Sequence, residues 1–532
     1  MNMGNPNRRA ILMSALGSGA FFLLPRISVA QGADTTGETT PFSYDILTDM
    51  ARDLATRPWQ APDIPDADVL ERIDYDQHNR IAFRKEHGLW QGQEGASPVH
   101  AFFPGRYFKN PVRLHTVQDG QAVELPFSLD MFDIPGDSPA QELTQTTGFA
   151  GFRVQDGKTE QDWMAFLGAS YWRTSGYSGQ FGLSVRGLAI DTAIPDGPEE
   201  FPNFTHFWLE PGENGDITAY ALLDSPSATG AYRIASFRDN GVIQNVAARI
   251  FLRKDVERLG VAPLTSMFWF GKNTPHIAPD WRPEVHDSDG LEIVTGSGEQ
   301  IWRPLNNPPR TMTNTFSAPS VKGFGLMQRE RDFDQYQDDG VFYEKRASLW
   351  VEPGQDWGEG SVTLVELRTD DEIHDNIVAF WQPGAPAAAG TEYDLQYRLS
   401  WVQDSPLPAT TGHFIATRIG AGGVPGQPRP ADTVKLVCDF RAEGVEGLGR
   451  EDGVAVNATA SAGTVRDGVA YPVVGTDYWR AMADLDFAGL PEDDDTPIDL
   501  RLFVEHGGAA LTETLLLQLF PSQLRALLDS TP

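Results

Sequence analysis

Short alternating runs of apolar and polar residues fill most of this chain. FRVQDG, WMAFLGASYW, ITAYALLD, NVAARIFLR and SVTLVELR are examples, and residues that favour turns separate them. Brief runs with a period of two are typical of β-strands. Because strands do not alternate with long helices, the pattern argues against a doubly wound α/β fold. It predicts an all-β protein with large antiparallel sheets.

One segment near the start has a helical period instead. In residues 43–59, SYDILTDMARDLATRPW, Ser43 is suited to cap the first turn. The apolar side chains that share one helical face are Ile46, Leu47, Met50, Ala51 and Leu54. We therefore expect one helix ahead of the sheets.

The strand pattern is interrupted at residues 382–394, QPGAPAAAGTEYD, where Pro, Ala and Gly replace it. We interpret this segment as a linker between two domains. After it, EYDLQYRLSWVQD, TVKLVCDF, IDLRLFVEH and TETLLLQLF are well-spaced strands that suit a small immunoglobulin-like sandwich. The predicted domains are a β-sandwich over residues 31–384 and an immunoglobulin-like domain over residues 385–532.

The first residues predict an export signal. Arg8 and Arg9 precede an apolar stretch from Ala10 to Leu24, and small residues follow at 28–30. This order is typical of a signal peptide, and the arginine pair indicates the twin-arginine route. The apolar stretch is shorter than the roughly 20 residues of a membrane span, and no later segment approaches that length. We expect residues 1–30 to be removed and the mature chain to be exported and soluble.

Composition narrows the class of ligand. The 532 residues include 40% hydrophobic and 22% charged side chains, which is typical of a globular protein. With 74 acidic and 42 basic side chains, the net charge of −32 opposes binding to nucleic acid. A neutral ligand such as a sugar meets no such repulsion. Cys438 is the single cysteine, so it forms no internal disulfide, and its strand-like surroundings predict a buried apolar filler.

Residues 369–383, TDDEIHDNIVAFWQP, place a group of carboxylates directly before an apolar strand. Glu372 and Asp375 are three residues apart, so one turn brings both side chains to the same surface. Like charges and an apolar wall both raise the pKa of a carboxyl group, as a general acid requires near neutral pH. The alternative is a solvated acidic loop, in which His374 also faces solvent.

A second acidic segment, His286-Asp287-Ser288-Asp289-Gly290, resembles half of a calcium loop. The glutamate that would complete the twelve-residue pattern is missing, so an Asx-type turn is the alternative and we predict no metal. The chain also contains no HExxH, CxxC or GxSxG. It therefore lacks the signatures of zinc proteases, dithiol redox proteins and esterases, and we expect no cofactor.

Several aromatic residues have polar or charged neighbours, as in GASYWR, FYEKR and SLWVEP. They are Tyr171, Trp172, Trp269, Trp302, Phe342, Tyr343, Trp350 and Trp381. Exposed aromatic faces stack on sugar rings, while Arg, Asn and Asp bind the hydroxyls. For each residue alone, packing in the core is the alternative. As a set they favour a carbohydrate groove.

Longer strings in the chain resemble a known family. FLGASYWR, GLSVRGLAIDT, EEFPNFTHFWLEP, LGVAPLTSMFWFG, HDSDGLE, KGFGLMQRERDFDQYQD, RASLWVEP and DNIVAFWQP follow one another in this order. In these strings the chain is similar to the osmoregulated periplasmic glucan biosynthesis proteins of the OpgG/OpgD (MdoG/MdoD) type. The similarity runs from about Phe42 to Trp401 and more weakly to the end, and the arginine pair in the leader looks more like the OpgD branch.

The resemblance implies a fold and an activity. The fold is a large N-terminal β-sandwich of the galactose-mutarotase-like supersandwich kind, which holds the glucan cleft, followed by a C-terminal immunoglobulin-like β-sandwich. The activity is that of a periplasmic endo-β-1,2-glucanase that inverts the anomeric centre. Asp375 in DNIV matches the general acid, and Asp287 in HDSD matches the base, which reaches its water through a relay of hydroxyls or waters. Glu372 matches the family's acidic residue three positions before the acid, and Tyr343 matches the family's tyrosine ahead of the LWVEP strand.

We predict that six residues bind the substrate, β-1,2-glucan. They are Tyr343, Arg346, Trp350, Tyr171, Arg173 and Trp302. Together with Asp375, Asp287 and Glu372 they make up the expected site.

Two alternative functions stay open beside the glucanase. In the first, the same acid serves a β-1,2-glucan transglycosylase that closes rings through a different linkage. In the second, the chain is a non-catalytic glucan-binding partner of a membrane glucan synthase. A functional link to that synthase and a homodimer are further expectations.

Overall fold

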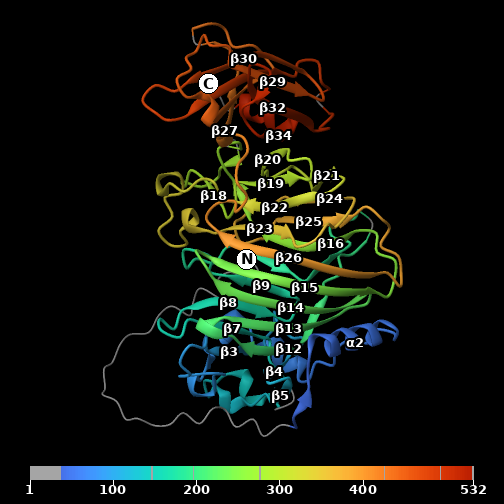
Figure 1. The fold of residues 1–532 in the computed structure, drawn as a ribbon. Coiled ribbons are helices and arrows are strands. Elements are labelled where there is room, and N and C mark those ends of the chain that lie inside the picture. Colours follow the sequence, from blue (N-terminus) through green and yellow to red (C-terminus); the bar gives the residue numbers. More distant parts are fainter. Residues whose placement is uncertain are drawn as a thin grey trace. The chain divides into compact units, whose positions relative to one another are not determined.

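The computed structural model describes residues 38–144, 148–195, 197–274, 277–424, 426–491 and 493–529. The predicted signal peptide, residues 1–30, lies outside this part of the chain. No helix among the described residues is long and apolar enough to cross a membrane. Strands dominate the described chain (Figure 1), and the predicted all-β fold is confirmed.

The described residues form two compact units. The first lies within Met1–Pro263 and Ala385–Leu399, and the second within Leu264–Gly384 and Ser400–Pro532. The domain boundaries predicted from the sequence, 31–384 and 385–532, stay a prediction.

The first unit contains two sheets. One follows the order β1 (Thr40–Pro41), β5 (Gln121–Leu125), β4 (Arg113–Gln118), β12 (Asn203–Pro211), β13 (Ile217–Asp224), β14 (Ala228–Arg238), β15 (Val242–Leu252) and β26 (Glu392–Val402). The other follows the order β10 (Ser184–Arg186), β9 (Tyr171–Thr174), β8 (Asp162–Leu167), β7 (Gly151–Gln155) and β3 (Val99–Phe102). Stacked and edge-on phenylalanine rings fill the core between them, as where Phe207 meets Phe152 and Phe166.

The predicted N-terminal helix is present as α2 (Tyr44–Ala55). The Ser43 side chain accepts the N–H of Ile46 and caps the first turn. Leu47 and Ala51 are fully buried in a cluster with Trp208 and Phe251. Burial of a leucine side chain stabilises the fold by roughly 1.5–3 kcal/mol, so tertiary packing holds this short helix in place.

Most strands of the second unit also belong to two sheets. One follows the order β23 (Ser348–Pro353), β22 (Val321–Met327), β19 (Gly290–Thr295), β20 (Gln300–Pro304), β34 (Thr514–Leu519), β32 (Ile498–His506) and β29 (Ala455–Ala460). The other contains β21 (Met312–Ala318), β24 (Gly360–Glu366) and β25 (Ile377–Pro383). A small hairpin pairs β17 (Phe268–Phe270) with β18 (Val285–His286), and it carries the first part of the candidate site.

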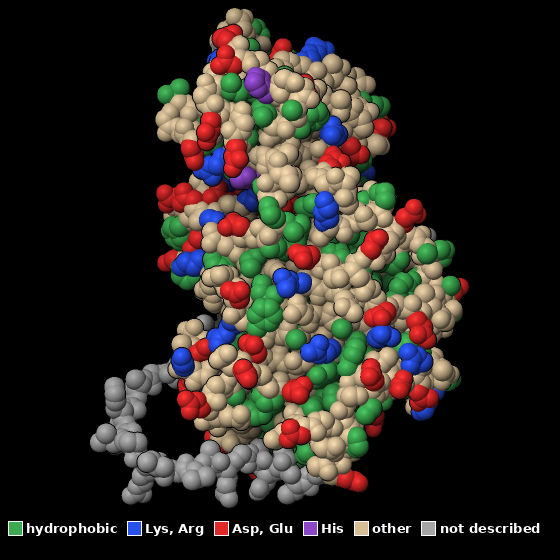
Figure 2. Space-filling model, viewed as in Figure 1, with side chains coloured by type: hydrophobic (Ala, Val, Ile, Leu, Met, Phe, Trp, Pro, Cys, Tyr) green, Lys and Arg blue, Asp and Glu red, His purple; other side chains and the backbone are tan. Residues whose placement is uncertain are grey.

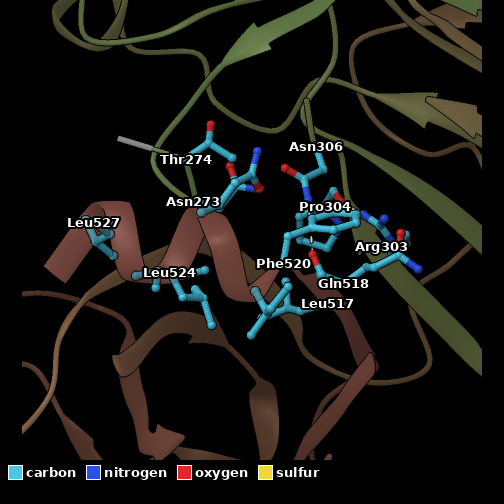
Figure 3. Close-up of a pocket in the computed structure, with 13 residues that line it drawn as sticks. Asn273, Thr274, Arg303, Pro304, Asn306, Leu517, Gln518, Phe520, Leu524 and Leu527 are labelled. Carbon is cyan, nitrogen blue, oxygen red and sulfur yellow. Dashed lines mark hydrogen bonds between the residues drawn. The ribbon is translucent and has the colours of Figure 1, made fainter. Parts of the chain in front are cut away.

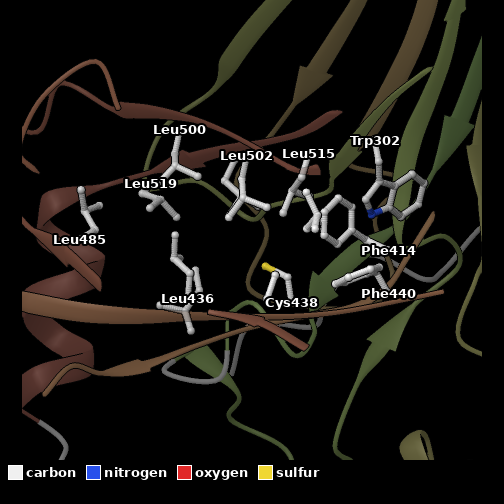
Figure 4. Packing of buried hydrophobic residues seen from close by; sticks show 14 of the residues in the cluster. Trp302, Phe414, Leu436, Cys438, Phe440, Leu485, Leu500, Leu502, Leu515 and Leu519 are labelled. Carbon is white, nitrogen blue, oxygen red and sulfur yellow. The ribbon is translucent and has the colours of Figure 1, made fainter. Parts of the chain in front are cut away.

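A four-stranded sheet near the C-terminus completes the second unit. Its order is β27 (His413–Ala421), β28 (Thr433–Arg441), β31 (Trp479–Asp486) and β30 (Thr464–Pro472). Leu436 and Cys438 of β28 face Leu502 and Leu515 across a hydrophobic cluster (Figure 4). Burial raises the pKa of the Cys438 thiol to about 12, so the predicted apolar filler is confirmed. The helix α5 (Pro521–Asp529), which the sequence pattern did not predict, packs Leu524 against this cluster.

Figure 2 shows acidic and basic side chains interspersed over the drawn face of the molecule. Many form exposed ion pairs, such as Arg72 with Glu142 and Arg80 with Asp137. Solvent screens exposed pairs of this kind, so the fold depends on its apolar cores rather than on them.

Candidate active site

Asn376 fixes the loop that carries Asp375. This loop joins β24 to β25, and the buried Asn376 amide closes it against β17. Asn376 Oδ1 accepts the N–H of Phe268 at 2.9 Å, and its Nδ2 donates to the Phe268 carbonyl at 2.9 Å. The same Nδ2 donates to the Leu367 carbonyl at 2.9 Å. The amide thus replaces a pair of strand hydrogen bonds and sets Asp375 beside β17.

A second asparagine ties the other end of this loop to the same strand. Asn307 Oδ1 accepts the N–H of Thr369 at 3.0 Å. Asn307 Nδ2 donates to the Thr369 carbonyl at 2.8 Å and to the Trp269 carbonyl at 3.1 Å. Because Trp269 follows Phe268 in the chain, both ends of the acidic loop are held by neighbouring residues.

Asp287 follows β18 and is held from the opposite side of the hairpin. Its N–H donates to the Met267 carbonyl at 2.8 Å, and the hydroxyl of Ser288 lies 2.6 Å from that of Ser266. The Asp287 side chain is fully buried, and Arg346 Nε lies 3.5 Å from its Oδ1. Asp287 and Asn376 therefore bind consecutive backbone positions of one segment, which brings the two predicted carboxylates to the same region.

Glu372 belongs to a charged network on the outer side of the loop. The Arg282 guanidinium binds both Glu372 oxygens, at 3.0 and 3.1 Å, and the Tyr343 hydroxyl donates to Glu372 Oε2. Arg282 also binds Asp338 at 2.7 Å and Asp280 at 2.6 Å. Burial lowers the pKa of Arg282, but its hydrogen bonds to Asp280, Glu372 and Asp338 outweigh burial and raise it. The guanidinium is thus a fixed cation that orients Glu372.

Sequence reasoning missed Arg282, because a single arginine in WRPEVHDSDG carries no motif. It also assigned no role to Asn376, although the residue lies within DNIV. The useful signal was the position of Asn376 directly after a candidate acid, where a buried amide is suited to hold a loop.

A buried charged cluster lies behind Asp287. Lys272 Nζ pairs with Glu284 and lies 2.7 Å from Glu330 Oε2. His286 Nε2 lies 3.3 Å from Glu284 Oε2 and 3.4 Å from Asp289 Oδ1. The Glu284, His286 and Asp289 ligand atoms lie within 4.8 Å of one another. Since the Lys272 ammonium already forms an ion pair with Glu284, we assign no metal to this cluster.

Of the predicted substrate-binding residues, Tyr343 and Arg346 lie in this site and are each 2% exposed. Trp302 and Trp350 instead lie in the hydrophobic cluster of the second unit, 3% and 0% exposed. The Arg329 guanidinium lies 3.6 Å from the centre of the Trp302 ring. Neither tryptophan presents a ring face to solvent.

Tyr171 and Arg173 belong to β9 of the first unit. Tyr171 is half-buried, and the buried Arg173 guanidinium lies 5.0 Å from the centre of the Phe181 ring. Their predicted contact with substrate stays a prediction.

A cavity in the second unit lies against α5 (Figure 3). Asn273 and Thr274 line one side of it, and Phe520, Leu524 and Leu527 line the other. Gln523 Nε2 of α5 donates to the Asn307 carbonyl at 2.9 Å. The residue that holds the acidic loop is thus bonded to the C-terminal helix.

Fold and site together define an all-β protein in which asparagine and arginine side chains hold a group of acidic residues. The family described as "Periplasmic glucan biosynthesis protein, MdoG" matches residues 42–519. The chain belongs to this family of periplasmic glucan biosynthesis proteins.

Close relatives carry the name glucans biosynthesis protein D. Glucans biosynthesis protein D 2 of Ralstonia nicotianae is 46% identical over 536 residues, which is 97% of this chain and 98% of that protein. Glucans biosynthesis protein D of Xanthomonas oryzae is 42% identical over 97% of this chain and 98% of its own. The same protein of Stenotrophomonas maltophilia is 44% identical with the same coverage. The resemblance to the D branch is confirmed.

Among solved structures, a galactose mutarotase related enzyme of Lactobacillus acidophilus aligns with 49% of this chain and 94% of its own. Its sequence identity is 11% and its TM-score is 0.21, which is too low to support an argument about this chain.

Proposed function

We propose that this chain is a periplasmic enzyme that processes β-1,2-glucan, namely an anomer-inverting endo-β-1,2-glucanase. Asp375 acts as its general acid and Asp287 as its general base. One observation carries the proposal: the Asp287 N–H binds Met267, and the amide beside Asp375 binds Phe268. Two acids that lie far apart in the sequence are thus tied to neighbouring residues of one segment, Met267 and Phe268. Membership of the glucan biosynthesis family adds support for the substrate class.

In the proposed reaction Asp375 donates its proton to the glycosidic oxygen as that oxygen leaves the anomeric carbon. A water attacks the carbon from the opposite face and passes a proton through a relay to Asp287. Inverting enzymes that use one water hold their carboxyl groups roughly 6.5–9.5 Å apart. The complete burial of Asp287 beside Arg346 supports the relay, because a buried carboxylate does not meet the attacking water directly.

Glu372 serves a supporting role in this proposal. Arg282 and Tyr343 hold its carboxylate in one orientation near Asp375. A fixed negative charge at this point favours the positive charge that develops on the sugar ring.

The second candidate is a β-1,2-glucan transglycosylase. The same burial of Asp287 favours it, since a relay that ends at a sugar hydroxyl transfers the chain instead of hydrolysing it. In that case the hydroxyl attacks the anomeric carbon, its proton passes to Asp287, and no reducing end is released. The relatives named for glucan biosynthesis are consistent with either product.

The test is product analysis on linear β-1,2-glucan. We expect wild-type protein to release new reducing ends that first carry the inverted anomeric configuration, measured by NMR. Asp375→Asn should lower the rate by about 10²–10⁴-fold, because it removes the proton donor. Asp370→Asn is the matched control in the same loop, since its side chain is 87% exposed, and it should retain the wild-type rate.

Other outcomes would replace the proposal. Closed rings without new reducing ends would establish the transglycosylase. If the glucan binds but neither Asp375→Asn nor Asp287→Asn alters any product, the chain is a non-catalytic partner of the membrane synthase. The link to that synthase, the twin-arginine export to the periplasm and the homodimer stay predictions, which cell fractionation and cross-linking would check.

A further inference from the structure

The buried ring of His286 lies directly before Asp287 and is tightly enclosed. Phe268 stacks on one face, with ring centres 5.4 Å apart, and the Tyr336 ring meets it edge-on at 5.2 Å. The side chain is 1% exposed. Its two nitrogens therefore depend on protein partners alone, and these partners determine where its protons lie.

Gln328 fixes the proton on Nδ1. The Gln328 Nε2 donates to the Tyr343 carbonyl at 3.1 Å and to the Tyr336 hydroxyl at 2.7 Å. A carbonyl accepts and never donates, so the amide nitrogen of Gln328 must face Tyr343. Its Oε1 then faces His286 Nδ1 at 3.1 Å, and that nitrogen must carry a proton to donate.

The other ring nitrogen faces two carboxylates. Nε2 lies 3.3 Å from Glu284 Oε2 and 3.4 Å from Asp289 Oδ1. Without a proton its lone pair would point at two anionic oxygens inside the protein. With a proton it binds both, so the contacts of the two nitrogens together require the imidazolium form.

The charge balance around the ring leads to the same result. The titratable and charged groups near it are Lys272, Glu284, Asp287, Asp289, Arg329, Glu330 and Tyr336. Arg329 is engaged by Glu292 and Glu513, and Arg346 pairs with Asp287. Lys272 alone then opposes three carboxylates, and a neutral ring would leave two of them uncompensated in a buried site.

We propose that His286 is a buried imidazolium that positions Asp287 by bracing its turn, and that its deprotonation switches the enzyme off at alkaline pH. The ring at the start of the turn binds Asp289 at its end, so the pair encloses Asp287. Asp289 Oδ2 in turn accepts the N–H groups of Arg329 and Glu330. Through Gln328 the ring also holds the backbone of Tyr343, whose hydroxyl orients Glu372.

The direction of the pKa agrees with this geometry. Burial lowers the pKa of His286, but Asp289 and Glu284 outweigh burial and raise it above its usual value. A raised pKa in the folded state means that the ring stabilises the site at low and neutral pH. The contribution is lost as pH rises through the raised pKa. The inference of a positioning role rests on the proposed function, whereas the charge state of the ring does not.

The first test observes the ring without an activity assay. In wild-type protein labelled with ¹⁵N-histidine, we expect the His286 resonances to report protons on both nitrogens at neutral pH. His286→Gln identifies these resonances by their loss. A neutral tautomer or a metal-bound nitrogen at neutral pH would overturn the inference even if the protein is an active glucanase.

The second test measures kcat and KM for linear β-1,2-glucan against pH. His286→Gln keeps one N–H donor that does not titrate, so kcat should fall by roughly 10–100-fold, the size found for residues that orient active-site ligands. KM should stay within about twofold, and the alkaline loss of activity that we expect in wild type should disappear. An unchanged alkaline loss in this variant would contradict the role of His286.

His206→Gln is the control for this test. His206 is a partly buried histidine of the first unit, and burial lowers its pKa to about 4. Its substitution should leave the alkaline loss of activity in place. If His286→Gln does not fold, Asp289→Asn removes one partner of the imidazolium, and the alkaline loss should then shift to lower pH. An unshifted loss in Asp289→Asn would count against the proposal.

Discussion

Tyr343 shows how much of the site depends on a single hydroxyl group. Its ring packs in a buried cluster with Met267 and Phe270, while its hydroxyl donates to Glu372. The ring and the hydroxyl have separate roles, because Arg282 holds the same carboxylate independently.

Tyr343→Phe separates these roles. We expect kcat to fall by roughly 10–100-fold, the size found for residues that orient active-site ligands, because Glu372 loses one of the groups that orient it. The thermal midpoint should change little, because the ring still fills its place. A loss of stability as large as the loss of activity would instead show that the hydroxyl has a mainly structural role.

Two glycines explain why the Trp350 and Trp302 side chains are buried. A Cβ on Gly323 would lie 2.4 Å from the Trp350 ring, and one on Gly290 would lie 2.4 Å from the Trp302 ring. Each tryptophan thus fills the space above a glycine in a neighbouring strand. The polar neighbours of Trp350 in SLWVEP suggested that its ring is exposed, but the pairing of β23 with β22 buries it.

At the scale of elements, the loop between β24 and β25 is the part of the site most sensitive to substitution. Asn376 gives it three hydrogen bonds to backbone groups, and Asn307 gives it three more contacts at its other end. These bonds satisfy backbone groups that would otherwise be buried without partners.

Asn376→Ala should destabilise this region by about 2–4 kcal/mol, because it leaves several buried backbone groups without partners. We expect a lower urea midpoint together with loss of the proposed glucanase activity. Asp370→Ala in the same loop is the control and should change stability by less than about 0.5 kcal/mol, since its side chain is exposed. Equal effects of the two substitutions would contradict the role of the Asn376 amide.

For the whole molecule, buried histidines predict opposite effects at the two ends of the pH range. Burial lowers the pKa of His100 and of His206 to about 4, so their neutral forms stabilise the fold above their unfolded value of 6.5. This contribution is lost as pH falls from 6.5 through 4. The pKa of His286 is raised above 6.5, so its contribution is complete below pH 6.5 and is lost as pH rises from 6.5 through the raised pKa.

We therefore expect the thermal midpoint to be highest near pH 6.5 and to fall on both sides. Thermal unfolding between pH 4 and pH 9 checks this. His206→Gln should reduce the fall on the acid side and leave the alkaline side unchanged. A midpoint that stays constant from pH 6.5 down to pH 4 would contradict the assignment of the buried neutral histidines.

The sequence by itself determined the strand pattern, the N-terminal helix, the buried Cys438 and the family. Each of these depends on local periodicity or on continuous strings such as HDSDGLE and DNIVAFWQP. Only the tertiary structure decided that Asp287 and Asn376 are bonded to neighbouring residues, how Arg282 joins Glu372, and that Trp302 and Trp350 are buried. The physical reason is that burial and hydrogen bonding in this protein join segments far apart in the chain, as when Asn376 binds Phe268, and periodicity within one segment carries no information about such partners.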